Sequence, residues 1–167
     1  MGGSGWNPTP EKDRLSISRS RPDEAGRDVR DILIVEDSHT DVFLIRDALK
    51  SAQVVANVHV VRDGYAATNF FDAADADPNA PCPALVLLDL NLPKKTGAEV
   101  LKHLRESRRC QAAQVLIISS SDSVRDRASV EHLGAAGYFK KPTEYEAFMK
   151  LGPVVKALLD KPEQSNQ

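Results

Sequence analysis

The sequence predicts an α/β protein: a parallel β-sheet with helices on both faces. Two observations support this fold class. The strand-like segments, 32–35 and 84–88 above all, are apolar at every position, as expected of strands covered on both sides. The stretch after the first of them carries Val42, Ile45 and Leu49 on one helical stripe. Apolar strands that alternate with amphipathic helices indicate βαβ units.

The remaining elements follow the same alternation. Further strands are expected at 54–61, 115–118 and 137–140, and further helices at 41–52, 64–76, 97–107, 123–133 and 144–159. Asp122 can cap the helix that begins at residue 123, and Gly134 ends it. Gly152 and Pro153 interrupt the last helix, so we expect a kink there. Right-handed crossovers should place the binding site beyond the carboxyl ends of the strands.

Length and composition indicate a single domain of ordinary composition. The chain has 167 residues, of which 41% are hydrophobic and 28% charged. We expect a domain at 31–160, between tails at 1–30 and 161–167 that are rich in polar residues. The formal net charge of −2 gives no reason to expect nucleic acid as a partner.

No apolar run approaches the roughly 18–20 residues of a membrane span, and the N-terminus has no signal-peptide core, so we expect a cytoplasmic protein. Cys82 and Cys110 form no C-x-x-C motif, and we expect both to be reduced.

Distinctive polar residues stand where the predicted strands end. Glu36 and Asp37 follow the first strand, Asp89 ends the third, Ser119 ends the fourth and Lys141 follows the fifth. The carboxyl ends of parallel strands share one edge of the sheet. These five residues should therefore meet at one site.

Three carboxylates gathered at one site repel each other, and a hard divalent cation with oxygen ligands would relieve that repulsion. Mg²⁺ fits, because it commonly bridges carboxylates and a phosphate. Asp37 and Asp89 are the predicted direct ligands, and Glu36 would act directly or through water. The alternative for Asp37 and Glu36 is helix capping and interaction with the helix dipole. The presence of Asp89 and Lys141 at the same edge favours the metal site.

The same residues suit phosphoryl transfer, which requires mainly positioning and charge neutralisation. Asp89 can act as a nucleophile toward phosphorus, Lys141 supplies a second cation, and Ser119 can donate a hydrogen bond to a phosphate oxygen. Pro142 follows Lys141, and a cis Lys141–Pro142 peptide bond would aim the lysine inward, so we expect that bond to be cis. The neighbouring Lys140 is expected to be solvated.

Over about residues 31–160 the chain resembles the receiver domain of bacterial two-component response regulators. The resemblance rests on four segments in order: ILIVEDS, LVLLDLNLPKKTG, VLIISSSD and GAAGYFKKP. It implies a flavodoxin-like sheet with strand order 2-1-3-4-5, and an Asp89 that accepts a phosphoryl group from a histidine kinase with Mg²⁺ bound. It also implies that the backbone carbonyl of Asn91 is a third protein ligand of Mg²⁺. Ser119 and Tyr138 occupy the two positions that change conformation when the family's aspartate is phosphorylated.

More narrowly, VEDSHTDVFLIRDALK and DLNLPKKTGAEVLKHLRES resemble small stand-alone regulators that partner phytochrome-type sensor kinases. Glu36 replaces a commoner aspartate, and Lys94-Lys95-Thr96 replaces a loop that often carries an acidic residue. The family's output surface would lie at about 122–159. Charges alternate in sign at Arg125, Asp126, Arg127 and Glu131, as suits a homodimer, although a solvated helix explains the pattern equally well.

Other classes of protein fit less well. A phosphohydrolase that uses an aspartyl nucleophile would carry a second aspartate two residues after it, where Asn91 stands and cannot shuttle a proton. A flavodoxin-like cofactor binder would need a glycine-rich loop after the first strand, where SHTD stands instead. A pseudo-receiver scaffold would have lost a key residue. A shuttle that passes its phosphoryl group to another histidine remains open beside a terminal binding switch.

Overall fold

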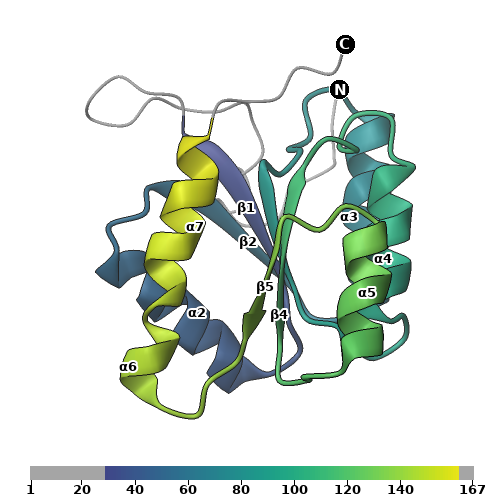
Figure 1. Cartoon of the computed structure of the whole chain (residues 1–167). Helices are drawn as coiled ribbons and strands as arrows, with labels where there is room; N and C mark the ends of the chain where they lie inside the picture. The colour runs from purple at the N-terminus through teal and green to yellow at the C-terminus, as the bar shows by residue number, and fades with distance from the viewer. Residues whose placement is uncertain (1–28, 162–167) are drawn as a thin grey trace.

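The computed structural model describes residues 29–161, which form a five-stranded parallel sheet with helices on both faces (Figure 1). The strand order is β2-β1-β3-β4-β5, so the predicted fold class and strand order are confirmed. The strands are β1 (Arg30–Val35), β2 (Ala56–Val61), β3 (Leu85–Leu88), β4 (Gln114–Ser119) and β5 (Gly137–Lys140). The helices are α2 (His39–Ser51), α3 (Gly64–Ala76), α4 (Gly97–Arg105), α5 (Val124–His132), α6 (Tyr145–Phe148) and α7 (Leu151–Asp160).

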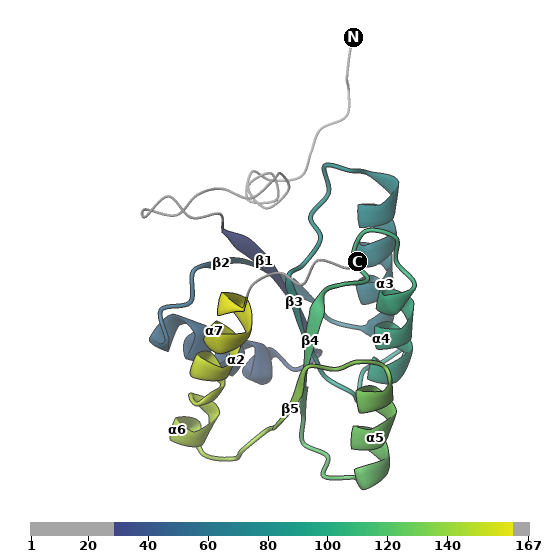
Figure 2. The ribbon, with the colours of Figure 1, turned by 45° about the horizontal axis from the view of Figure 1, so that its top comes forward.

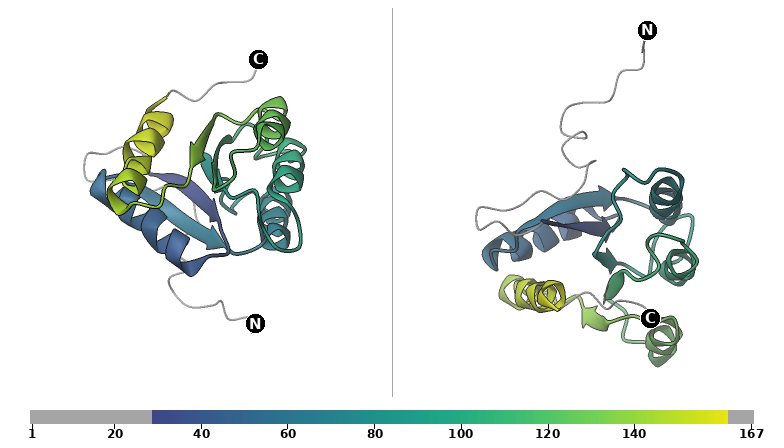
Figure 3. Two further views of the ribbon diagram at one scale, coloured as in Figure 1. Left: turned by 60° about the horizontal axis from the view of Figure 1, so that its bottom comes forward. Right: turned by 90° about the horizontal axis from the view of Figure 1, so that it is seen from above.

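The helices form two layers on opposite faces of the sheet. Helices α2, α6 and α7 cover one face, and α3, α4 and α5 cover the other (Figures 1 and 2). Seen from above, the sheet separates the two layers along its whole width (Figure 3). In the described part of the chain, no helix is long and apolar enough to cross a membrane.

Burial on both faces explains why residues 32–35 of β1 and all of β3 are apolar. Along β1, Leu33 and Val35 belong to the core under α3 and α4, whereas Ile32 and Ile34 belong to the core under α2 and α7. Successive side chains of a strand point to opposite faces. A strand with a core on each side therefore has no position for a polar residue until it reaches the edge of the sheet.

Side-chain caps fix where most of the helices begin. Ser38, Asp63 and Thr96 accept hydrogen bonds from backbone N–H groups in the first turns of α2, α3 and α4. The prediction that Asp122 caps the fourth long helix was wrong, because Ser123 takes that place. Asp122 instead pairs with Lys140 on the neighbouring strand end.

The last predicted helix is two helices rather than one kinked helix. Met149 and Lys150 separate the two helices; their backbone angles stay right-handed helical, but the hydrogen bonds of Lys150 N to Ala147 O and of Gly152 N to Met149 O span three residues instead of four. Pro153 lies in the first turn of α7. Proline is tolerated there because the first backbone N–H groups of a helix have no partner within the helix. Gly152 lies against Ala48 of α2, which brings α7 close to that helix.

The structure joins Cys82 and Cys110 in a disulfide, so the prediction that both are reduced was wrong. The two residues stand 28 positions apart, but each precedes a strand, β3 and β4 respectively, and these strands are neighbours in the sheet. Their Cα atoms are 5.5 Å apart, which is ordinary for a disulfide. Spacing in the sequence alone did not indicate this proximity.

Removing the disulfide is expected to lower the free energy of unfolding by roughly 2 kcal/mol, because the bond closes a loop in the unfolded chain. The measurement is thermal unfolding of the oxidised protein with and without a reductant, beside the Cys82→Ser/Cys110→Ser variant. Reductant should lower the melting temperature of the wild type and leave that of the double variant unchanged. Equal melting of all samples would contradict a disulfide in the folded protein.

Candidate functional site

The polar residues predicted to share a site do meet at the carboxyl edge of the sheet. Hydrogen bonds continue the strand pairing past the last strand residues: Asp89 N donates to Val35 O at 3.1 Å, and Lys141 N donates to Ser119 O at 2.8 Å. Glu36 N donates to Val61 O in the same way. The backbone of the site is therefore an extension of the sheet, which fixes where each side chain begins.

Glu36, Asp37 and Asp89 form a cluster of three carboxylates. Each offers one oxygen, and the three oxygens lie within 4.8 Å of one another. Glu36 and Asp89 are 1% and 5% exposed, whereas Asp37 is exposed, so the cluster reaches solvent at Asp37. Such a donor set, all oxygen and anionic, with one side open to water, fits a hard divalent cation that keeps part of its hydration shell.

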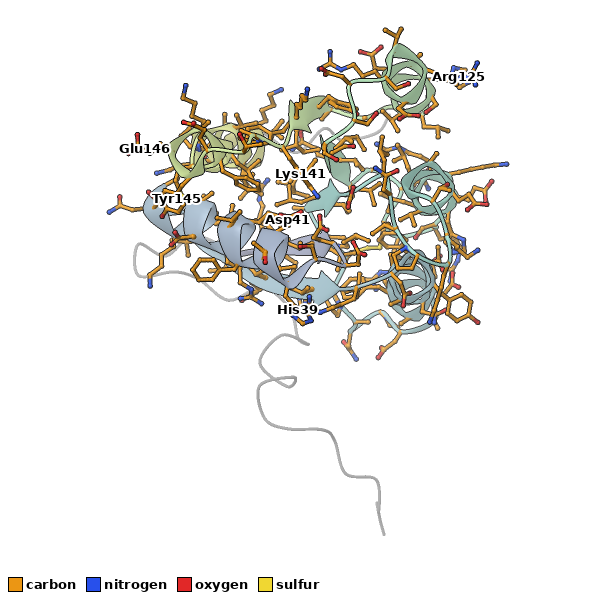
Figure 4. The ribbon with its side chains drawn as sticks, turned by 90° about the horizontal axis from the view of Figure 1, so that it is seen from below. His39, Asp41, Arg125, Lys141, Tyr145 and Glu146 are labelled. Atoms are coloured by element: carbon orange, nitrogen blue, oxygen red, sulfur yellow. A yellow bond between two sulfur atoms is a disulfide. The ribbon has the colours of Figure 1, made fainter. Side chains whose placement is uncertain are left out.

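Lys141 supplies the positive charge of the site. Its Nζ donates to Asp41 Oδ2 at 2.7 Å and to Glu36 Oε1 at 2.8 Å, and lies 3.4 Å from Asp89 Oδ2. The side chain is 12% exposed, and Figure 4 shows Lys141 directed toward Asp41 in the first turn of α2. Among residues 29–161 no peptide bond is cis, so the predicted cis Lys141–Pro142 bond was wrong. The lysine reaches the carboxylates from a trans peptide because its position follows from the pairing of β5 with β4.

Burial and charge shift the pKa values of the paired groups. Burial of Glu36, together with the nearby charge of Asp89, raises the pKa of Glu36 to about 7, although the hydrogen bond from Lys141 opposes the rise. Burial lowers the pKa of Lys141, but hydrogen bonds to Asp41 and Glu36 outweigh it and hold that pKa above its ordinary value. At neutral pH the lysine is therefore an ammonium group.

The raised pKa of Glu36 predicts how the free energy of unfolding depends on pH when no divalent cation is bound. The pKa is about 7 in the folded state against an ordinary 4.5, so between these values the folded state holds a proton that the unfolded state has released. The free energy of unfolding should fall by roughly 1 to 3 kcal/mol from this group as pH rises through that window. Chemical denaturation in EDTA between pH 5 and 8 measures it.

Two variants serve as comparisons in that experiment. Glu36→Gln cannot titrate, so its stability should fall less over the same pH range, whereas the exposed Glu131→Gln should follow the wild type. A wild-type profile parallel to that of Glu36→Gln would contradict the raised pKa.

A backbone N–H group of the loop after β3 orients the Asp89 carboxylate. Asn91 N donates to Asp89 Oδ1 at 3.1 Å, which leaves Oδ2 toward Lys141. The start of α4 packs tightly here, since a Cβ atom on Gly97 would lie 2.7 Å from both Asp89 O and Leu90 Cα. The predicted role of the Asn91 carbonyl as a metal ligand stays a prediction.

Ser119 and Tyr138 both contact the loop between β4 and α5. Ser119 is fully buried, and its hydroxyl accepts a hydrogen bond from Ser121 N at 3.1 Å. The Tyr138 hydroxyl donates to Ser121 O at 2.9 Å, and the guanidinium carbon of Arg127 lies 4.5 Å from the centre of its ring. The two predicted switch residues thus share Ser121 as a partner. Lys140 lies outside the site, as predicted, and pairs with Asp122.

Sequence reasoning missed Asp41, the residue with the shortest contact to Lys141. It lies in the first turn of α2, where an acidic residue favours the helix dipole and needs no other explanation. A helix that begins directly at the sheet edge turns its first-turn residues toward the neighbouring strand ends. That placement was the signal that could have identified it.

Comparison with known proteins identifies the family of this chain. Residues 32–151 match the family model of the response regulator receiver domain. Response regulator Rcp1 from Synechocystis is 33% identical over 120 residues, which cover 72% of this chain and 82% of that protein. The crystal structure of the phosphorylated cyanobacterial phytochrome response regulator RcpA superimposes with a TM-score of 0.72 at 31% identity, covering 79% of this chain and 95% of that one. The Mn²⁺-bound form of Rcp1 gives 0.71 at 30% identity, covering 81% and 99%.

The five-stranded parallel sheet with acidic residues at its carboxyl edge agrees with the match to the receiver domain, a domain of signalling proteins. This chain belongs to the response regulator receiver domain family, and it is homologous to stand-alone phytochrome response regulators.

Proposed function

We propose that the protein is a single-domain response regulator in which Asp89 accepts a phosphoryl group from a histidine kinase. The observation that carries the proposal is the position of the Asp89 carboxylate, which is within 4.8 Å of the oxygens of Glu36 and Asp37 and 3.4 Å from Lys141 Nζ. An aspartate needs both a cation site and a lysine nearby to receive an anionic group, because the product adds negative charge to an acidic site.

The transfer can be written from the residues of the site. An oxygen of Asp89 attacks phosphorus, the bond between phosphorus and the histidine nitrogen of the donor breaks, and that nitrogen keeps the electron pair and takes up a proton from solvent. Lys141 neutralises a phosphoryl oxygen, and Ser119 offers its hydroxyl to another. Glu36, Asp37, Asp89 and the Asn91 carbonyl would hold Mg²⁺, which supplies further charge neutralisation when bound.

The contacts of Ser119 and Tyr138 support a route from the site to the surface. Ser119 must turn its hydroxyl toward the phosphoryl group, which removes its hydrogen bond with Ser121 N. The Tyr138 hydroxyl donates a hydrogen bond to the carbonyl of Ser121. A change in the loop between β4 and α5 therefore alters a contact that holds the Tyr138 ring in place. A two-state switch needs an energy difference of only a few kcal/mol between its states.

The output surface would comprise α5, β5, α6 and α7. Arg125 points away from the domain in Figure 4, and the alternating charges of α5 suit reciprocal ion pairs in a homodimer. RcpA is a cyanobacterial phytochrome response regulator, which supports a phytochrome-type kinase as the donor here. We place this exchange in the cytoplasm.

The proposal is tested by incubating the full chain with acetyl phosphate, with Mg²⁺ or with EDTA. Intact-mass spectrometry should detect one added phosphoryl group only in the presence of Mg²⁺, and peptide mapping after borohydride reduction should locate it on Asp89. Beryllofluoride, which mimics a phosphoryl group, should give one bound ¹⁹F signal with the same Mg²⁺ requirement. No adduct under any of these conditions would overturn the proposal.

A further inference from the structure

We propose that Asp41 is a positioning residue that holds the Lys141 ammonium away from Asp89 and so restrains phosphorylation. The inference rests on the proposed function and adds to it a residue outside the carboxylate cluster. The inference is based on the two carboxylates that compete for the Lys141 ammonium group. Lys141 Nζ lies 2.7 Å from Asp41 Oδ2 and 3.4 Å from Asp89 Oδ2.

The contacts of Lys141 are unequal. Its three hydrogens face three carboxylates, and those of Asp41 and Glu36 take the two short hydrogen bonds. The Asp89 contact, at 3.4 Å, lies beyond the usual length of a charged hydrogen bond. In this state the lysine binds Asp89 least well of its three partners.

Asp41 cannot readily follow Lys141 if the lysine moves toward Asp89. Asp41 N donates to Ser38 Oγ at 3.2 Å, and Ser38 N donates to Glu36 Oε2 at 3.1 Å, so the start of α2 is bonded to the site itself. Farther along, Asp47 of α2 accepts a hydrogen bond from Tyr145 of α6. Helix α2 is thus fixed at both places, and the two carboxylates compete for Lys141 from fixed positions.

Phosphorylation of Asp89 changes the balance between Asp41 and Asp89 for the Lys141 ammonium group. The phosphoryl group brings negative charge to Asp89, and Lys141 must shift toward it to neutralise a phosphoryl oxygen. The movement weakens its short contact with Asp41. Asp41 is therefore expected to slow the reaction through Lys141, and removal of its charge should accelerate it.

Asp41→Asn removes the charge and keeps the shape. With acetyl phosphate and Mg²⁺ we expect the rate of adduct formation to rise roughly threefold to tenfold, as for the loss of one charged hydrogen bond. Asp41→Glu should restore a rate near that of the wild type. Asp47→Asn is the matched control. It removes one negative charge from the same helix at a residue that contacts Tyr145 rather than Lys141, and its amide oxygen can still accept the Tyr145 hydrogen bond, so its rate should stay unchanged.

A double-mutant cycle separates action through Lys141 from general repulsion. In a Lys141→Met background, Asp41→Asn should no longer accelerate adduct formation, and it should no longer strengthen the binding of beryllofluoride, followed by ¹⁹F NMR. An equal acceleration in both backgrounds, or a rate for Asp41→Asn at or below that of the wild type, would overturn the inference while the proposed function stands. A wild type without any Mg²⁺-dependent adduct would instead overturn the proposed function.

Discussion

Asp89→Asn is expected to abolish the Mg²⁺-dependent phosphoryl adduct, leaving at most a few per cent of the wild-type signal in intact mass. The amide is a poor nucleophile toward phosphorus, and the change removes one of the three carboxylates that would bind the cation. The fold should tolerate it. The Asn91 N–H can still bond a side-chain oxygen at this position, and the loss of one charge reduces repulsion with Glu36.

Asp63→Asn is the matched control for that experiment. Asp63 also follows a strand, β2, but its side chain caps α3 through Ala66 N and pairs with Lys94, so it takes no part in the carboxylate cluster. Asparagine caps helices about as well as aspartate, and this variant should be phosphorylated at the wild-type rate. An adduct that forms on Asp89→Asn as it does on the wild type would refute Asp89 as the acceptor.

The fold could be predicted because periodicity and burial agree along most of the chain. The helix at 64–76 and the strand at 137–140 have the predicted bounds, and other element ends moved by one to a few residues. The main disagreement, around Phe148 to Leu151, arose where apolar spacing continued through an interruption of the α-helical hydrogen bonds. Side-chain spacing reports which face is buried, and it does not report whether consecutive turns share one axis.

The site was predictable to the extent that it follows from strand order. Glu36, Asp37, Asp89, Ser119 and Lys141 all stand at strand ends, and the parallel sheet brings strand ends together. What the sequence could not supply were contacts set by packing between elements.

The clearest such contacts are those of Asp41 and the disulfide. Asp41 meets Lys141 only because α2 begins beside the end of β5, and Cys82 meets Cys110 only because two loops turn at the opposite edge. Neither pair has a spacing that distinguishes it from chance. The trans Lys141–Pro142 bond was missed for a related reason: a cis bond was invoked to aim a lysine that the pairing of β5 already aims.

Gly152→Ala should lower the free energy of unfolding by about 3 kcal/mol, even though alanine is the better helix former. A Cβ atom at this position would overlap the Ala48 carbonyl oxygen and lie 2.7 Å from the Ala52 Cβ atom, so α7 must move away from α2. Overpacking of this kind against backbone lies at the costly end of its usual range. Helix propensity alone would instead stabilise the variant by up to about 1 kcal/mol.

The opposite signs of packing and propensity make the measurement decisive. Thermal unfolding should show a melting temperature lower by roughly 10 °C for Gly152→Ala, whereas Ala157→Val, at an exposed position of the same helix, should change it by only a few degrees. A more stable Gly152→Ala would mean that α7 does not approach α2 as closely as the structure has it.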